Sequence, residues 1–302
     1  MKNSTATGTT ATASIPAPYR GRFAPSPTGL LHTGSLVAAL ASWLDARSRG
    51  GTWLIRMEDL DTPRVVPGAA DAILDTLAAF GLESDEPVLY QSTRHEAYHT
   101  ALQQLDARHR AYRCSCSRSD VQGAYSGHCR DLKLHTPDSA WRLRLDSGQI
   151  EFVDGLQGDC SASTTMLGDP IIFRRDGIAA YQLAVVVDDA MQGITHVVRG
   201  ADLLDSTCWQ IAIANALDLP VLQYAHLPLV TEPDGSKLAK SRRSLPLDPC
   251  NAPTLLVEAL SLLLQQPSEG LTTATGRDIL RWAAENWRPE RLAGIREIRL
   301  RS

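Results

Sequence analysis

The sequence predicts an α/β protein: a doubly wound, Rossmann-like parallel sheet with an inserted metal-binding subdomain and a short helical C-terminal segment. Three observations indicate this fold class. The first part of the chain has the order strand, loop, helix, strand, which is typical of the βαβ unit of a parallel sheet. A cluster of cysteines then interrupts the alternation of strands and helices. Two helical patterns follow a polar, lysine-containing stretch near the end of the chain.

The first βαβ unit has clear signals at the ends of its elements. Residues 19–23 are predicted to form a strand that runs into a rigid, proline-containing loop at residues 25–29. A helix with one apolar face is predicted at residues 35–49, where two glycines stop it. The next strand, residues 53–57, ends at the carboxylate of Glu58. This order predicts that the polar residues after each strand meet at one edge of the sheet.

Two more helices are predicted before the cysteine cluster. One begins near Pro67 and ends at Gly81, with its apolar residues on one side. The other is expected to begin with a capping box formed by Thr93 and Glu96.

The rest of the chain alternates strands and helices again. Predicted strands lie at residues 141–145, 150–153, 171–173 and 195–199. A turn at residues 176–177 leads into an apolar stretch at residues 181–187, which is grouped with these strands. Predicted helices lie at residues 206–217, 253–264 and 277–287, with a polar loop at residues 232–245.

These patterns divide the chain into five parts. They are a disordered tail (1–18), the first half of the catalytic domain (19–111), an inserted zinc-bearing subdomain (112–168), the second half of the catalytic domain (169–247) and a helical C-terminal segment (248–302). The tail is rich in Thr, Ala, Ser and Pro and lacks the apolar segment of a secretory signal.

Bulk composition limits the class of protein. The chain has 302 residues, of which 43% are hydrophobic, so it can bury a sizeable core. Its formal net charge is -4, so a nucleic-acid partner would need a local basic face. No apolar run is long enough to cross a membrane. Without an export signal the six cysteines are expected to be reduced, which predicts a cytoplasmic protein.

The strongest functional signal is the segment at residues 22–35, which joins the first strand to the first helix. It places His32, Gly34 and Ser35 at the N-terminus of that helix. Free backbone N–H groups and the helix dipole favour a phosphate there, and a glycine lets a nucleotide approach the backbone closely. The imidazole of His32 can donate a hydrogen bond to a phosphate oxygen. Taken alone, His32 could equally be a capping residue.

A second signal lies in the polar loop, where Lys237 and Lys240 follow the turn at Gly235. A mobile cationic loop can close on a triphosphate and neutralise the charge that develops during transfer. Taken alone, this loop could be a solvated run of charge.

Together these two segments resemble the paired signatures of class I aminoacyl-tRNA synthetases. Residues 32–35 (His-Thr-Gly-Ser) resemble the HIGH motif, with Ser35 in place of the second histidine. Residues 237–241 (Lys-Leu-Ala-Lys-Ser) resemble the KMSKS motif, and both lysines are kept. The resemblance implies that Mg-ATP is a substrate, that His32, Lys237 and Lys240 are catalytic, and that ATP is bound by His32, Gly34, Ser35 and Lys240.

Residues 22–29 (Arg-Phe-Ala-Pro-Ser-Pro-Thr-Gly) are similar to the opening of the glutamyl enzymes of this family. The side-chain chemistry agrees, because Arg22 and Arg199 are forked cations suited to a carboxylate and Glu58 can hold an ammonium group. Tyr181 can donate a hydrogen bond within the pocket, and Val185 replaces an asparagine of ordinary glutamyl enzymes. The resemblance implies a glutamate site formed by Arg22, Phe23, Ala24, Pro25, Ser26, Glu58, Tyr181 and Arg199.

The region after the lysine loop is short, with only about two helices. Family members that charge tRNA(Glu) carry a long anticodon-binding region there, so the chain resembles the glutamyl-queuosine branch of the family. That resemblance implies activation of L-glutamate and its transfer to queuosine at the first anticodon position of tRNA(Asp). Three alternatives stay open: a truncated enzyme that charges the 3′ end of tRNA(Glu), a non-catalytic tRNA-binding paralogue, and a small-molecule ligase or nucleotidyltransferase.

Cys114, Cys116 and Cys129 lie in one short, loop-rich stretch, and three thiolates make a tetrahedral structural zinc site plausible. By chemistry His128 is the easier fourth ligand, but its neighbour Cys129 already occupies the site; the family resemblance implies Tyr125. The other three cysteines are expected to be packing residues.

Because the net charge is negative, attraction to RNA phosphates is expected to come from individual arginines. The candidates are Arg113, Arg118, Arg130, Arg242, Arg243, Arg288, Arg291, Arg296 and Arg299. A monomer is expected.

Overall fold

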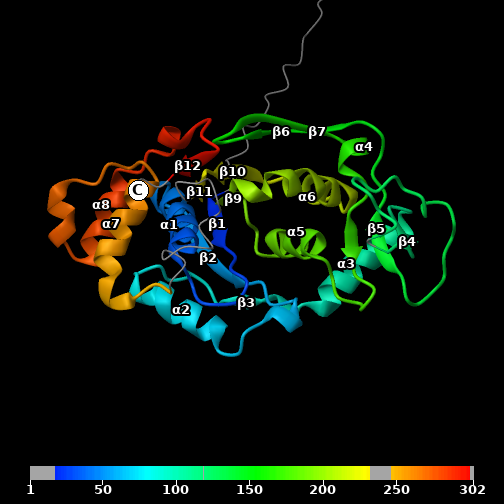
Figure 1. Cartoon of the computed structure of the whole chain (residues 1–302), viewed down its shortest axis with the longest axis horizontal. Helices are drawn as coiled ribbons and strands as arrows, with labels where there is room; N and C mark the ends of the chain where they lie inside the picture. Colours follow the sequence, from blue (N-terminus) through cyan, green and yellow to red (C-terminus); the bar gives the residue numbers. More distant parts are fainter. Residues whose placement is uncertain (1–17, 118, 232–245, 300–302) are drawn as a thin grey trace, which may run out of the picture.

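The computed structural model describes residues 18–117, 119–231 and 246–299. Its central layer is a parallel sheet in two adjoining parts (Figure 1). In one part β1 (Arg20–Phe23), β2 (Thr52–Met57) and β3 (Leu89–Tyr90) pair in that order. In the other, β9 (His196–Gly200) pairs with β10 (Gln223–Leu227), and β10 pairs with β6 (Gln149–Asp154). The two parts meet where the backbone N–H of Thr195 donates to the carbonyl of Arg20, at 2.9 Å.

Both faces of this sheet are covered by helices, which is why its strands are apolar on both sides. Trp53, Ile55 and Met57 of β2 pack into the core that contains α1, whereas Leu54 packs into the core that contains α6. The alternation follows the period of two residues in a strand. The predicted doubly wound α/β fold is therefore confirmed.

The helices match the predicted ones within a few residues, apart from α4, which was not predicted, and the two corrections below. They are α1 (Thr33–Ser48), α2 (Ala69–Ala79), α3 (His95–Ala107), α4 (Thr164–Leu167), α5 (Tyr181–Met191), α6 (Leu204–Ala216), α7 (Ala252–Leu262) and α8 (Gly276–Glu285). Among the described residues, no helix combines the length and apolar composition that crossing a bilayer requires.

Two local predictions were wrong. The stretch at residues 181–187 is not a strand but the first turns of α5, whose buried side packs on α6 and α3. Its β-branched residues suggested a strand, but helix packing overrode that preference. Thr93 does not cap α3: it lies in a 3-10 turn and its hydroxyl donates to the carbonyl of Tyr90, at 2.7 Å.

The region at residues 111–173 contributes to two sheets. β4 (Ala111–Cys114), β5 (Ala140–Leu143) and β8 (Ile171–Phe173) form an antiparallel sheet at one end of the molecule (Figure 1). The hairpin of β6 and β7 (Gly158–Ser163) instead joins the parallel sheet through β10. Strand pairing therefore crosses both expected boundaries of the insertion, and the division into domains stays a prediction.

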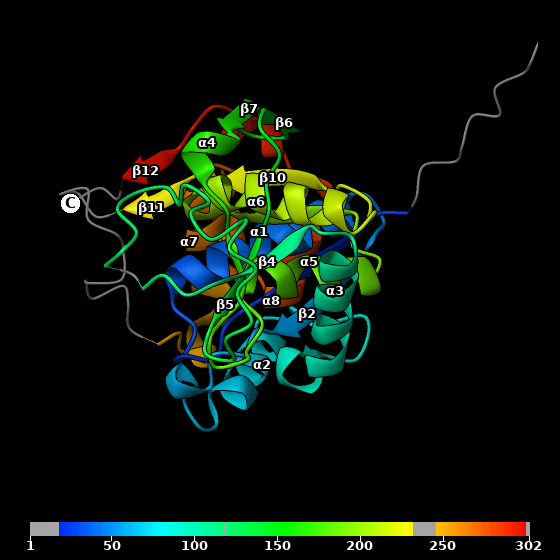
Figure 2. The same ribbon diagram turned by 90° about the vertical axis from the view of Figure 1, so that its right-hand side faces the viewer.

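The C-terminal segment packs against the first helix. Leu256 and Leu260 of α7 and Ile279 of α8 belong to the same buried core as α1. β12 (Glu297–Arg299) then pairs in parallel with β11 (Leu229–Thr231), side by side in Figure 2. Neither strand was predicted from the sequence. The C-terminal strand thus lies beside the strand that leads into the lysine loop.

Candidate functional site

Two pockets adjoin at the carboxyl ends of the parallel strands, between β1 and β9. Ligands of doubly wound sheets bind at such a point, where the strand order reverses. We name them the Arg199 pocket, about 530 Å³, and the His32 pocket, about 560 Å³. They form one continuous cleft, because four residues line both. These are Phe23, Ser26, Ala38 and Gly200.

The His32 pocket is built on the N-terminus of α1. His32 is the N-cap, and its Nδ1 accepts a hydrogen bond from the backbone N–H of Gly34, at 3.1 Å. The proton of the neutral ring is therefore on Nε2, free to be donated to a ligand, and burial lowers the pKa of His32. A Cβ on residue 34 would lie 3.1 Å from the imidazole, which explains the glycine. Ser35 also lines this pocket.

The Arg199 pocket collects most of the residues that the sequence assigned to an amino-acid site. Seven of the eight line it: Arg22, Phe23, Ala24, Ser26, Glu58, Tyr181 and Arg199. Pro25 lies on the wall of the neighbouring His32 pocket instead. The pocket thus brings together side chains that come from β1, β2, α5 and β9. Their roles stay predictions.

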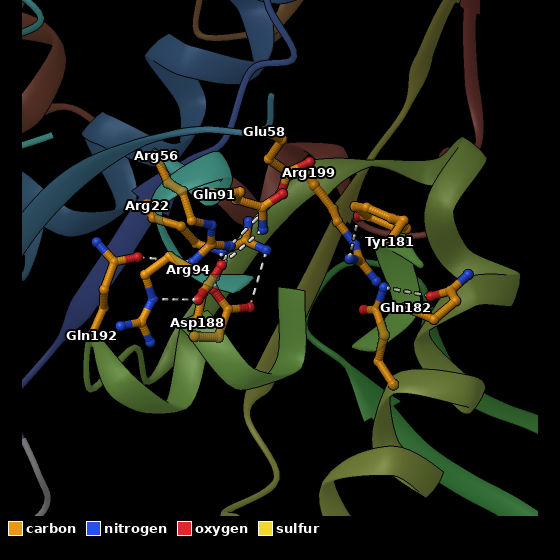
Figure 3. A network of polar contacts seen from close by, with 12 residues as sticks. Arg22, Arg56, Glu58, Gln91, Arg94, Tyr181, Gln182, Asp188, Gln192 and Arg199 are labelled. Atoms are coloured by element: carbon orange, nitrogen blue, oxygen red, sulfur yellow. Dashed lines mark hydrogen bonds and ion pairs between the residues drawn. The ribbon is translucent and has the colours of Figure 1, made fainter. Parts of the chain in front are cut away.

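Arg22 is held by a buried carboxylate that the sequence analysis did not select. Asp189 of α5 accepts two hydrogen bonds from Arg22, at 3.0 Å from Nε and 3.2 Å from Nη2. Arg56 of β2, which is fully buried, lies 2.7 Å from the same carboxylate and donates to Gln192. Figure 3 shows Arg22 and Arg56 side by side above α5. The fork of Arg22 is therefore partly used, which leaves Nη1 for a ligand.

Glu58 carries a buried carboxylate oxygen without a hydrogen-bond donor among the described residues. This atom is Oε1, which lies 3.8 Å from Nη2 of Arg56. Burial raises the pKa of Glu58 to about 7, against the opposing charges of Arg56 and Arg22. An unsatisfied buried acceptor that faces a pocket is suited to a donor from a ligand, such as an ammonium group.

Arg199 differs from Arg22 and Arg56, because no carboxylate of the described residues forms an ion pair with it. Its Nε donates to His226, at 3.1 Å, and its Nη2 to the hydroxyl of Thr207, at 2.8 Å. Its Nη1 lies 3.5 Å from the hydroxyl of Tyr181, which Figure 3 shows facing it. Burial lowers the pKa of Arg199. A buried cation with neutral partners favours an anionic ligand.

A second buried acid, Asp188, fixes the wall beside this network. It accepts hydrogen bonds from Tyr98, at 2.6 Å, and Gln91, at 2.9 Å, and pairs with Arg94, at 3.2 Å. The sequence held a signal for both acids, since two adjacent aspartates interrupt an otherwise apolar stretch of α5. A buried acid in such a position needs a partner, which points to buried arginines elsewhere in the chain.

The predicted metal ligands converge. The sulfur atoms of Cys114, Cys116 and Cys129 all lie within 4.8 Å of one another. The hydroxyl of Tyr125 lies 3.3 Å from the sulfur of Cys114 and 3.8 Å from that of Cys116. Three thiols and a phenol around one point fit a tetrahedral zinc ion. No contact places His128 in this group, so the geometry favours Tyr125 as the fourth ligand.

Several predicted residues lie outside the described part of the chain: Arg118, Lys237, Lys240, Arg242 and Arg243. Of the remaining arginines expected at RNA, two are engaged by acids. Arg130 makes a bidentate pair with Asp169, and Arg299 pairs with Glu297.

Three of the other expected arginines, Arg113, Arg288 and Arg291, have only neutral partners among the described residues. Arg113 lies over the ring of Trp141, at 4.6 Å, and donates to Ser139. Arg288 and Arg291 donate to backbone carbonyls. These side chains are better placed than Arg130 to meet a phosphate.

The chain is similar to known proteins in both sequence and fold. The profile of the family described as "tRNA synthetases class I (E and Q), catalytic domain" matches residues 19–249. A protein named "Glutamyl-Q tRNA(Asp) synthetase" from Dechloromonas aromatica (strain RCB) is 52% identical, over 89% of this chain and 94% of its own length. A protein of the same name from Pseudomonas fluorescens (strain Pf-5) is 51% identical, over 91% of this chain and 94% of its own length.

Solved structures agree on the fold. A glutamate tRNA ligase from Elizabethkingia meningosepticum superposes with a TM-score of 0.79 at 23% identity, covering 93% of this chain and 67% of that chain. A glutamate-tRNA synthetase from Elizabethkingia anophelis gives a TM-score of 0.80 at 24% identity, with coverages of 94% and 68%.

Proposed function

Because this chain belongs to the class I tRNA synthetase family for glutamate and glutamine, we propose that it activates L-glutamate with ATP and esterifies queuosine with the glutamyl group. The acceptor is the queuosine at the first anticodon position of tRNA(Asp). Relatives of similar length that are about half identical carry that name, and they match this chain over nearly their whole length. The enzyme is a ligase whose substrates are an amino acid, ATP and a tRNA.

The observation that carries the choice of amino acid is the charge pattern of the Arg199 pocket. Arg199 is a buried cation without an acidic partner among the described residues, and Glu58 offers a buried oxygen without a donor. Glutamate has two carboxylates and one ammonium group, which complement these side chains. Nη1 of Arg22 and the hydroxyl of Tyr181 supply further donors.

The first step is a reaction between a substrate in the Arg199 pocket and a substrate in the His32 pocket. An oxygen of the glutamate α-carboxylate attacks the α-phosphorus of ATP, the bond to the β-phosphate oxygen breaks, and pyrophosphate leaves. Nε2–H of His32 and the N-terminus of α1 stabilise the phosphate charge, since they line the pocket next to the amino-acid site. We assign the same role, stabilising the phosphate charge, to Lys237 and Lys240. Mg²⁺ bound to ATP would neutralise part of the phosphate charge.

In the second step the acceptor nucleotide must enter the cleft while ATP-derived adenylate and glutamate occupy the rest of it. A hydroxyl of the queuosine cyclopentenediol attacks the acyl carbon of glutamyl-adenylate, and AMP leaves with the bonding electrons. ATP and glutamate occupy the His32 pocket and the inner end of the Arg199 pocket. We take the outer end to be the part lined by Asp61, Arg64 and Arg174, where Asp61 forms ion pairs with both arginines. We assign this end to the acceptor nucleotide, with the two arginines beside its phosphates.

The cysteine cluster fits a structural zinc ion rather than a catalytic one. Its ligands are Cys114, Cys116, Tyr125 and Cys129, and no carboxylate or histidine of the described residues joins them to activate water. The cluster still lies close to the cleft, because Arg175, next to the pocket residue Arg174, donates to the carbonyl of Ser115 at 2.5 Å. We propose that the zinc stiffens this rim, and that the enzyme is a cytoplasmic monomer.

Glutamate-dependent ATP–pyrophosphate exchange, with and without tRNA, tests the first step. We expect exchange without tRNA, because every residue that we assign to the amino-acid site belongs to this chain. Exchange with glutamine in place of glutamate, or the absence of exchange with glutamate, would refute the assignment.

Transfer of radiolabelled glutamate tests the second step. The label should attach to tRNA(Asp) from cells that make queuosine, but not to tRNA(Asp) from queuosine-deficient cells or to tRNA(Glu). It should survive periodate oxidation of the 3′ end and be prevented by prior oxidation of the queuosine diol. Label at the 3′ end of tRNA(Glu) would establish a truncated glutamyl-tRNA synthetase instead, and tRNA binding without exchange would establish a non-catalytic paralogue.

A further inference from the structure

A row of three buried side chains begins at Arg199, which lines the Arg199 pocket, and continues behind the pocket through His226 to Asp154, which do not line it. Arg199 is on β9, His226 is on the neighbouring β10, and Asp154 is at the end of β6 on the far side of β10. Asp154 and His226 are essentially shielded from solvent, at 2% and 0% exposure. The three residues therefore span adjacent strands of the parallel sheet.

Asp154 is the fixed end of this row. Its Oδ1 accepts hydrogen bonds from the backbone N–H groups of Leu156, Gln157 and His226, at 2.9–3.0 Å. Its Oδ2 lies 2.5 Å from Nδ1 of His226. A carboxylate with three backbone donors stays charged, so the contact at Oδ2 must come from an N–H of the imidazole.

This contact fixes the tautomer of His226. With the proton on Nδ1, the lone pair of Nε2 points at Arg199 and accepts from its Nε, at 3.1 Å. Thr207 supplies a second side-chain acceptor, for Nη2 at 2.8 Å, and the hydroxyl of Tyr181 a weaker third, for Nη1 at 3.5 Å. The guanidinium is thereby held in one orientation by acceptors that carry no charge.

The contrast with Arg22 shows what this arrangement achieves. Arg22 is oriented by Asp189, a carboxylate, and that pairing offsets its charge. At Arg199 the acid is one residue further away, with a neutral imidazole between the two. The orientation is kept, but the positive charge remains for the pocket.

We propose that His226, held by Asp154, is a positioning residue that orients Arg199 while leaving its charge for a carboxylate of the glutamate substrate. The proposal rests on the proposed function, since it assumes that the Arg199 pocket takes glutamate. It makes His226 and Asp154 determinants of specificity for an acidic amino acid, although neither contacts the substrate.

The test measures ATP–pyrophosphate exchange in three variants. His226→Phe keeps a ring but removes the acceptor, and it should raise the KM for glutamate about tenfold or more. The KM for ATP should not change. His226→Gln, whose amide oxygen can accept from Arg199, should recover most of the loss. His196→Phe is the matched control, because His196 is a half-buried histidine on the same strand as Arg199 and lines neither pocket.

A glutamate KM in His226→Phe equal to that of the wild type would overturn the proposal, as would an equal rise of both KM values. If His226→Phe does not fold, Thr207→Val removes the second neutral acceptor with little change of shape, and its glutamate KM decides in the same way. Failure of the proposed function is distinguishable, because the wild-type enzyme would then show no glutamate-dependent exchange at all.

Discussion

At the scale of single residues, the Arg199 pocket has two groups of opposite charge that lack a partner of the matching kind among the described residues. Glu58 has a buried oxygen without a hydrogen-bond donor, and Arg199 has no acidic partner. Glu58 and Arg199 were selected from the sequence by their side-chain chemistry and by the family resemblance. Their partners could not be selected in the same way. Asp189, Arg56 and His226 are defined by burial and by contacts across strands that are distant in sequence, and no local spacing encodes those contacts.

Glu58 gives a prediction about pH. Burial raises its pKa to about 7, so the carboxylate form needed for the substrate ammonium is present above that pH and is lost as the pH falls through it. The kcat/KM for glutamate in the exchange reaction should therefore fall by about tenfold per pH unit on the acid side of neutrality.

Glu58→Gln is the control for this pH profile. It should have a low kcat/KM that no longer depends on pH in that range, because the titrating group is gone. A wild-type profile that stays flat from neutral to mildly acidic pH would contradict the role given to Glu58.

Arg22 gives a prediction about the substrate. Arg22→Leu should lower kcat/KM for glutamate about thirtyfold or more, since removing one partner of a buried charge pair costs about 2–5 kcal/mol. Folding should survive, because Asp189 keeps its contact with Arg56. The matched control is Arg20→Leu, on the same strand but paired with the exposed Glu86 and lining neither pocket. Normal glutamate activation in Arg22→Leu would make Arg22 a purely structural residue.

At the scale of elements, strands and helices with strong apolar patterns were predictable, and short paired strands were not. β1, β2 and α1 lie close to their predicted ends because glycines and prolines mark those ends. β11 and β12 have three residues each and are defined by their pairing with each other. Neither segment has the unbroken apolar run that made β8, which is equally short, predictable.

The cysteine-containing element gives a prediction about metal. The purified protein should hold about one zinc ion per chain, and Cys114→Ser or Cys129→Ser should lose it and lower the thermal unfolding midpoint. Tyr125→Phe should weaken zinc binding if the phenol is the fourth ligand. Elemental analysis and thermal unfolding measure both effects.

Cys250 provides the control for the metal prediction, because it is exposed and outside the cluster. Cys250→Ser should keep its zinc and its unfolding midpoint. Metal-free wild-type protein with full stability and full exchange activity would rule out a structural zinc site.

At the scale of the whole molecule, the two ends of the protein differ in structure. The cysteine cluster and its antiparallel sheet form one end, and α7 and α8 form the other (Figure 1). The resemblance to the glutamyl-queuosine branch of the family, which rests on the two motifs, the glutamyl-type opening at residues 22–29 and the short region after the lysine loop, is confirmed by the family match and by the relatives of that name. The motifs identified the family, whereas the placement of α7 and α8 on α1 depends on packing that the sequence does not display.

This packing gives a prediction about stability. Leu256 of α7 is fully buried in the core shared with α1, so Leu256→Ala should lower the free energy of unfolding of the whole chain by about 2–5 kcal/mol. Chemical denaturation measures the change. Leu132→Ala, at a leucine that is 52% exposed, should change it by less than about 0.5 kcal/mol. A small effect at Leu256 would show that the C-terminal helices are a separate unit.

The pairing of β12 with β11 has a practical consequence for anyone who makes this protein. β11 ends at Thr231, directly before the segment that contains Lys237 and Lys240, and Thr231 donates to Glu297 of β12 at 2.7 Å. An affinity tag or fluorescent fusion added after Ser302 would follow β12 with only three residues between, and β12 is paired with the strand that precedes the segment of Lys237 and Lys240. The amino end of β1 lies at the opposite edge of the sheet from the cleft, so purification handles and reporters belong at the N-terminus.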